Sequence, residues 1–158
     1  MGFALCDMQV TSSAFEFGGA IPKAHTGEGA DSSPALAWSK APAGTKAYAV
    51  VCHDPDAPLL KPDAYGFVHW VLYNIPGSVT SLAEGCGDYT AGNNDFGNVG
   101  YGGPMPPGGH GRHHYFFWVF ALDQEMNLEP GLSMLDLFAR IEPHVLGMNR
   151  LVGTYEVS

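Results

Sequence analysis

Two carboxylates, Asp54 and Asp56, stand two positions apart at the end of an apolar segment, and the proline between them restricts the backbone. Two later segments of strand-like composition each contribute a histidine, His69 and His113. Acid pairs with imidazoles from separate strands are typical of binding pockets and catalytic sites. A turn capped by an Asx side chain would need only one of the two acids. We therefore take these four residues as the core of a candidate site.

Strand parity indicates which of these side chains can share a cavity. Residues two apart in a strand lie on one face, so His113 and Tyr115 can line the same cavity, whereas His114 points away from it. His69 shares a face with Phe67 and Val71. Parity alone does not tell which of the two faces meets the acid pair.

The elements that must position these residues are mainly strands. The chain has 21 glycines and 12 prolines and little helical periodicity, which predicts a mainly β fold with long loops. The expected strands cover residues 8–12, 15–17, 35–38, 47–53, 68–75, 115–122 and 153–157. The segments 48–52 and 68–73 are apolar on both parities, as in strands that are covered on both faces.

One helix is expected late in the chain, over residues 133–147. Ser133 is a plausible N-cap, followed three residues later by Asp136. The apolar face of this helix is expected to consist of Leu135, Phe138, Ile141 and Val145. Pro143 is expected to kink or split it. The glycine-rich segment 76–111 is interpreted as a folded loop that covers one end of the sheet.

Composition limits the function classes. A chain of 158 residues predicts one domain over 1–158. The 7 Lys and Arg residues against 16 Asp and Glu residues give a net charge of −9, which argues against nucleic-acid partners and against docking on anionic membranes. No apolar run of transmembrane length and no signal peptide is recognisable, so we expect a cytoplasmic protein without integral membrane association. Three widely spaced cysteines predict no structural zinc site, and Cys52 is expected in the core.

Five short motifs occur in order along the chain. They are Ser33–Ser39 with Pro42–Lys46, Asp54–Pro58, His69–Pro76, Asn94–Gly97 with Gly100–Pro104 and Pro106–Pro107, and His113–Phe116. Together, and at this spacing, the sequence resembles the phosphatidylethanolamine-binding protein family, in the bacterial and archaeal branch described as Raf kinase inhibitor-like. The resemblance covers nearly the whole chain.

The resemblance implies a large antiparallel sheet packed against a smaller sheet, a C-terminal helix and an anion-accepting pocket. It carries the ligand-binding positions over to Asp54, Asp56, His69, Pro107, His113 and Tyr115, with Tyr101 as a wall of the pocket mouth. Two positions depart from the family pattern, since His114 replaces an arginine and Met105 replaces a frequent cysteine. Because His114 points away from the cavity, we expect lost ion pairing behind the pocket rather than a lost ligand contact.

The leading hypothesis is a binding protein for a small phosphorylated or zwitterionic ligand, such as phosphate, a phosphoethanolamine-type head group or a nucleotide, without a cofactor. The resemblance also implies a regulatory role toward a kinase or another protein partner, and it favours a homodimer. The alternative is a metal-dependent hydrolase that uses Asp54, Asp56, His69 and His113 as ligands. A serine hydrolase lacks the Gly-x-Ser-x-Gly signature, and a binding role is expected rather than an enzymatic one.

Overall fold

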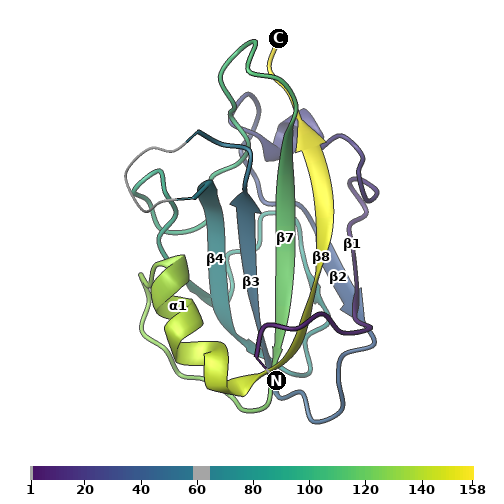
Figure 1. The fold of residues 1–158 in the computed structure, drawn as a ribbon, viewed down its shortest axis with the longest axis vertical. Helices are drawn as coiled ribbons and strands as arrows, with labels where there is room; N and C mark the ends of the chain where they lie inside the picture. The colour runs from purple at the N-terminus through teal and green to yellow at the C-terminus, as the bar shows by residue number, and fades with distance from the viewer. Residues whose placement is uncertain (1, 59–64) are drawn as a thin grey trace.

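The computed structural model describes residues 2–58 and 65–158. It consists of two antiparallel sheets and one α-helix (Figure 1). The larger sheet has the strand order β6-β4-β3-β7-β8 and the smaller one β1-β2-β5. The strands are β1 (Gln9–Thr11), β2 (Leu36–Ser39), β3 (Ala47–Asp54), β4 (Phe67–Pro76), β5 (Ser81–Leu82), β6 (Thr90–Ala91), β7 (His113–Leu122) and β8 (Val145–Tyr155). The helices are α1 (Met134–Ile141) and the 3₁₀ turns η1 (Lys23–His25) and η2 (Glu142–His144).

Both faces of the larger sheet are covered, which explains why β3 and β4 are apolar on both parities. On one face Val50, Trp70 and Phe117 pack against side chains of the smaller sheet such as Trp38. On the other face Val51 packs in a second cluster with residues of α1. Burying apolar area on both faces favours the fold by about 25 cal/mol per Å². The predicted fold class, two antiparallel sheets with a C-terminal helix, is confirmed.

Two of the predicted strands are wrong in detail. Residues 15–17 form an irregular segment and a turn, and the strand expected at 153–157 is the end of β8, which begins at Val145. Position 153, inside β8, is occupied by a glycine because a Cβ atom there would lie only 2.6 Å from Ile21 and 2.7 Å from Phe15. The glycine therefore marks a close approach of two segments rather than the start of a strand.

The helix is shorter than predicted. Ser133 caps it as expected, and its Oγ accepts the N–H of Asp136 at 3.0 Å, but α1 ends at Ile141. Pro143 lies in η2, and the chain enters β8 at Val145. The predicted apolar face is also shifted, since Leu137 is fully buried whereas Leu135 is 69% exposed.

The loop of residues 76–111 is folded and contains the short strands β5 and β6. Asp95 fixes it to β4, because its Oδ2 accepts the N–H of Val68 at 2.7 Å and its own N–H donates to the Val68 carbonyl at 2.8 Å. Asn94 Oδ1 accepts two further backbone N–H groups, those of Phe96 and Asn98. The bonds of Asp95 hold this part of the loop beside the start of β4, at one end of the larger sheet, as predicted, whereas β5 and β6 are edge strands of the smaller and the larger sheet.

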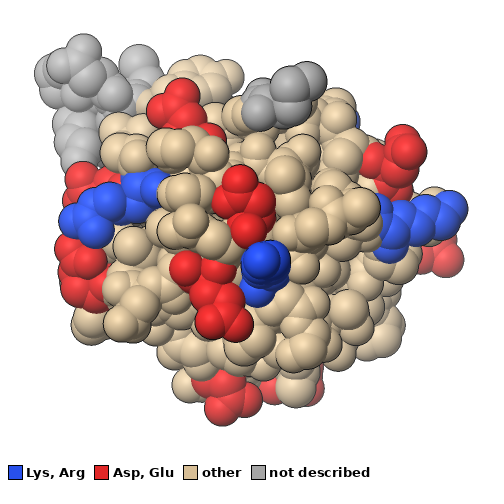
Figure 2. All heavy atoms as spheres, turned by 90° about the horizontal axis from the view of Figure 1, so that it is seen from below, with Lys and Arg blue, Asp and Glu red and all other residues tan. Residues whose placement is uncertain are grey.

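Charged side chains of both signs are scattered over the face of the molecule that Figure 2 draws. Figure 2 shows one end of the molecule, where Lys and Arg side chains lie in small, separate groups among Asp and Glu.

No helix within the described ranges has the length and apolar character needed to cross a bilayer. Cys6, Cys52 and Cys86 are all free thiols, and Cys52 is buried in the core as predicted.

Candidate functional site

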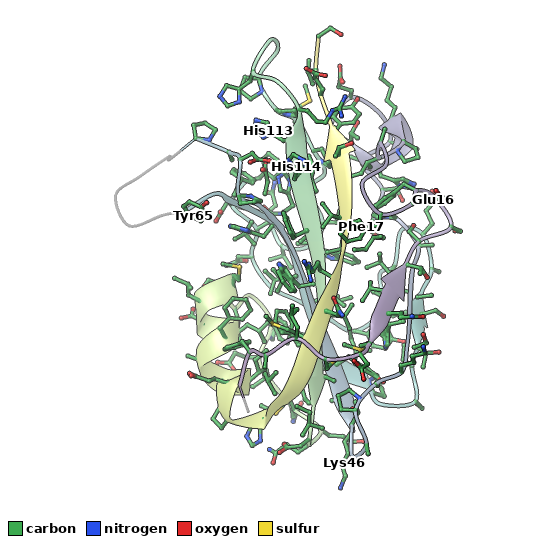
Figure 3. The ribbon with its side chains drawn as sticks, turned by 45° about the vertical axis from the view of Figure 1, so that its right-hand side comes forward. Glu16, Phe17, Lys46, Tyr65, His113 and His114 are labelled. Atoms are coloured by element: carbon green, nitrogen blue, oxygen red, sulfur yellow. The ribbon has the colours of Figure 1, made fainter. Side chains whose placement is uncertain are left out.

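The candidate residues meet at one end of the larger sheet. β3 ends at Asp54, and both of its antiparallel neighbours, β4 and β7, begin beside that end. The first residue of β7 is His113, which Figure 3 places at the opposite end of the molecule from Lys46, near the start of β3. The antiparallel order therefore gathers three stretches that lie far apart in the sequence.

Asp54 and His113 form a buried pair. Oδ2 of Asp54 accepts the Nδ1–H of His113 at 2.6 Å, and each side chain is only 3% exposed. The other oxygen, Oδ1, accepts the backbone N–H of Asp56 at 2.8 Å. Asp54 thus caps the Asp-Pro-Asp turn and orients an imidazole at the same time. Hydrogen bonds to a charged acceptor in a buried site are among the stronger ones in proteins.

His69 reaches this site through a β-bulge. Cys52 pairs with Trp70 and His53 pairs with Val68, so one residue of β4, His69, has no partner of its own in β3. Such an extra residue breaks the strict alternation of faces and redirects side chains near the end of a strand. The bulge determines on which face of β4 the His69 side chain lies, which strand parity alone could not. As a result, the His69 ring lies 5.2 Å from the ring of Tyr115 on β7.

The His69 ring is oriented by the loop. Its Nδ1–H donates to the carbonyl of Gly102 at 2.6 Å, while the backbone carbonyl of His69 accepts the Gly102 N–H at 2.9 Å. Burial lowers the pKa of His69, although the Gly102 carbonyl and the Asp54 charge act in the opposite direction. The neutral ring then carries its lone pair on Nε2, which can accept a proton from a ligand.

Tyr115 supplies a hydroxyl group. Burial, together with the neighbouring Asp54 charge, raises the pKa of Tyr115 well above its ordinary value. The phenol therefore stays protonated at neutral pH and remains a hydrogen-bond donor. His113 precedes it on the same face of β7, and their rings are stacked with centroids 6.4 Å apart.

Asp56 turns away from the pocket, contrary to the prediction. Its Oδ2 accepts both the backbone N–H and the Nδ1–H of His114, at 2.8 and 2.7 Å, on the exposed face of β7. Burial acts to raise the pKa of Asp56, but the bonds from His114 outweigh it and the pKa is lowered. His114 thus points away from the cavity as expected, and its ring forms a hydrogen bond with Asp56 at the position where the family pattern has an arginine.

Tyr101 is also displaced from its predicted position at the mouth. Its hydroxyl donates to the carbonyl of His25 at 2.6 Å, and its ring packs edge-on against Trp70 at 5.5 Å. The neighbouring Gly102 is bound to His69, so the chain turns Tyr101 inward toward η1. Burial raises the pKa of its phenol. Tyr101 supports the loop and does not line the cavity.

A cavity of about 180 Å³ lies over the paired strand ends. Four predicted site residues on the strands, together with Pro107 from the loop, line it. Among the described residues, the lining comprises Asp54, Ala57, Pro58, Phe67, His69, Phe96, Met105, Pro106, Pro107, His113 and Tyr115. Phe67, Phe96 and Met105 were not predicted as site residues, although Phe96 and Met105 fall in or beside the family motifs. The cavity therefore has a polar floor and an apolar rim.

The charges around this cavity restrict its chemistry. Within the described residues, its wall contains no lysine or arginine, so the positive charge that this part of the chain can offer a ligand comes from histidines. In the same part of the chain, no three His, Cys, Asp or Glu side chains converge as a metal-ligand set. Asp56, which the hydrolase alternative requires as a ligand, is bound to His114 instead. The arrangement thus offers hydrogen-bonding groups rather than a coordination sphere.

The sequence of this chain is similar to one family model and to relatives from bacteria and archaea. A family model described as phosphatidylethanolamine-binding protein matches residues 11–156. A UPF0098 protein of Aquifex aeolicus is 42% identical over 156 residues, which cover 94% of this chain and 88% of the relative. A UPF0098 protein of Methanothermobacter thermautotrophicus is 41% identical over 155 residues, covering 94% and 98% of the two chains.

Two crystal structures have a similar fold. A phosphatidylethanolamine-binding protein homologue of Chlamydia trachomatis, CT736, superposes with a TM-score of 0.88 at 35% identity and covers 96% of this chain and 98% of its own. E. coli YbcL, described as a member of the mammalian PEBP family, gives a TM-score of 0.87 at 33% identity, covering 97% and 100%. The similarity extends over both sheets and the helix.

Proposed function

Since the chain belongs to the phosphatidylethanolamine-binding protein family, in its bacterial and archaeal branch, it is a ligand-binding protein, and we propose that its cavity binds the phosphoryl group of a small ligand. Inorganic phosphate and the zwitterionic head group phosphoethanolamine have the appropriate chemistry. The observation that carries the proposal is the convergence of His69, His113 and Tyr115 beside Asp54 on one cavity.

The size of the cavity favours a small group. Pockets for drug-sized molecules measure about 300–1,000 Å³, and this cavity has about 180 Å³. A phosphoryl group fits such a volume, whereas the remainder of a nucleotide or a lipid would lie outside it. The apolar rim, which includes Phe96 and Met105, would contact that remainder.

Binding of an anion is coupled to uptake of a proton by His69. His69 is neutral because burial lowers its pKa, and its Nε2 then presents a lone pair to the cavity. A phosphoryl oxygen would be repelled by that lone pair and by the Asp54 carboxylate. Protonation of Nε2 converts it into a charged donor, and the phenol of Tyr115 supplies a neutral donor.

A binding role agrees better with these residues than a catalytic one. The described wall of the cavity offers no Ser, Thr, Cys or Lys side chain, and its carboxylate, Asp54, is engaged with His113 and with the N–H of Asp56. The relatives carry names without an activity. We therefore assign the imidazoles to ligand recognition.

Isothermal titration calorimetry with inorganic phosphate and with phosphoethanolamine tests the proposal. The informative variant is Tyr115→Phe, which removes a single hydroxyl from the cavity wall. It should weaken phosphate binding about fivefold, the contribution of one hydrogen bond of about 1 kcal/mol. Tyr48→Phe is the matched control, because Tyr48 is equally buried but lies at the other end of β3.

The two variants make the result interpretable. Equal affinities of the wild type and both variants would remove Tyr115 from the site. Absence of binding of either compound to the wild type between pH 5 and 8 would contradict the proposal as a whole.

A further inference from the structure

The loop residue His110 contacts the site from outside the cavity. Its Nδ1 lies 2.6 Å from Nε2 of His113, and their ring centroids are 4.9 Å apart. Because Nδ1 of His113 is bound to Asp54, both nitrogens of the His113 ring are engaged. Asp54, His113 and His110 therefore form one continuous chain of hydrogen bonds.

A second partner for Nε2 of His113 is excluded by the chemistry of the ring. Each imidazole nitrogen carries either one hydrogen or one lone pair, and so makes a single in-plane hydrogen bond. While His110 occupies that bond, a phosphoryl oxygen in the cavity cannot form it. One of the two must leave for the other to bind.

The contact can be released without moving the loop. The backbone of His110 is held in a turn in which its N–H donates to the Pro107 carbonyl at 3.1 Å. Gly109 takes a φ of 74°, as the third residue of a type II turn requires, and its N–H donates to the Val157 carbonyl at 3.1 Å. The His110 side chain is exposed and is not part of the cavity wall. Rotation of this one side chain into solvent frees His113.

We propose that His110 competes with the ligand for Nε2 of His113 and thereby sets the affinity of the pocket for oxyanions. The proposal rests on the function proposed above. It assigns His110 a role opposite to that of the residues on the cavity wall, since removal of its side chain strengthens binding. Phosphate bound to His113 leaves the His110 ring free in solvent.

Calorimetric titration of inorganic phosphate into the wild type, His110→Ala and His144→Ala tests this role. His110→Ala should bind phosphate about fivefold more tightly, because the ligand no longer displaces a hydrogen bond. His144→Ala is the control, since His144 also pairs with another side chain, Asp123, but lies at the opposite end of β7. Its affinity should equal that of the wild type.

Side-chain ¹⁵N NMR provides a second readout. The ring resonances of His110 should move toward those of a free imidazole during a phosphate titration of the wild type, and those of His113 should shift on His110→Ala substitution without phosphate. Unchanged or weaker phosphate binding by His110→Ala, with the wild type still binding, would overturn the competition alone. If neither protein binds phosphate, both the competition and the proposed function are wrong.

Discussion

Nδ1 of His113 lies 2.6 Å from Oδ2 of Asp54, although the two residues are 59 positions apart in the chain. The pair connects the end of β3 to the start of β7 and is removed from solvent, with 3% of each side chain exposed. Both the stability of this end of the sheet and the chemistry of the cavity depend on it.

Asp54→Ala should lower the free energy of unfolding by about 3 kcal/mol, because it leaves the buried His113 donor and the N–H of Asp56 without their acceptor. Urea denaturation measures the change. Asp123→Ala is the matched control, since Asp123 pairs with His144 at 3.0 Å but is 45% exposed. Exposed pairs contribute about 0–1 kcal/mol, so equal effects of the two substitutions would mean that burial of the Asp54 pair is unimportant.

Sulfate affinity should increase as the pH falls from 8 to 5. Sulfate stays a dianion over this range, so any change reports protonation of the protein. Binding requires a charged His69, and burial lowers the pKa of that residue from its ordinary value of 6.5. The increase should therefore continue below pH 6.5. A flat calorimetric profile would exclude the imidazoles as the source of positive charge.

Stability should also depend on the ionisation of His69. A folded-state pKa below the unfolded value means that the unfolded chain binds the proton more readily. The favourable contribution of neutral His69 is complete above about pH 6.5 and is lost as the pH falls toward the folded-state pKa. Urea titrations between pH 7 and 4.5 should show a shallower loss of stability for His69→Asn than for the wild type. Identical slopes would contradict this assignment.

Leu137→Ala should destabilise the protein by about 2–5 kcal/mol, because it leaves a cavity between α1 and the larger sheet. Leu135→Ala, two residues away on the same helix, should change the stability by less than about 0.5 kcal/mol, since Leu135 is 69% exposed. Thermal or urea denaturation of the two variants distinguishes the observed orientation of α1 from the one predicted by spacing. Comparable losses would favour the predicted face.

Much of the fold is determined locally and could be predicted from the sequence. The apolar runs of β3, β4 and β7 are long enough to identify strands covered on both faces, and Ser133 with Asp136 marks the start of α1. The end of α1 could not be predicted in this way. The apolar spacing continues through Pro143 to Val145, yet pairing with β7 favours an extended chain from Val145 onward. Long-range strand pairing thus overrides local periodicity.

The sequence by itself determined which residue types are available to the site and the face shared by His113 and Tyr115, because strand alternation is a local property. Only the tertiary structure decided which groups meet in the cavity. The bulge at His69 breaks the alternation of faces. Asp56 is hydrogen-bonded to His114 on the outer face, and the Tyr101 hydroxyl is hydrogen-bonded to the His25 carbonyl, away from the cavity. Each of these three contacts depends on a partner that is distant in sequence, and the spacing of residues along the chain carries no information about such partners.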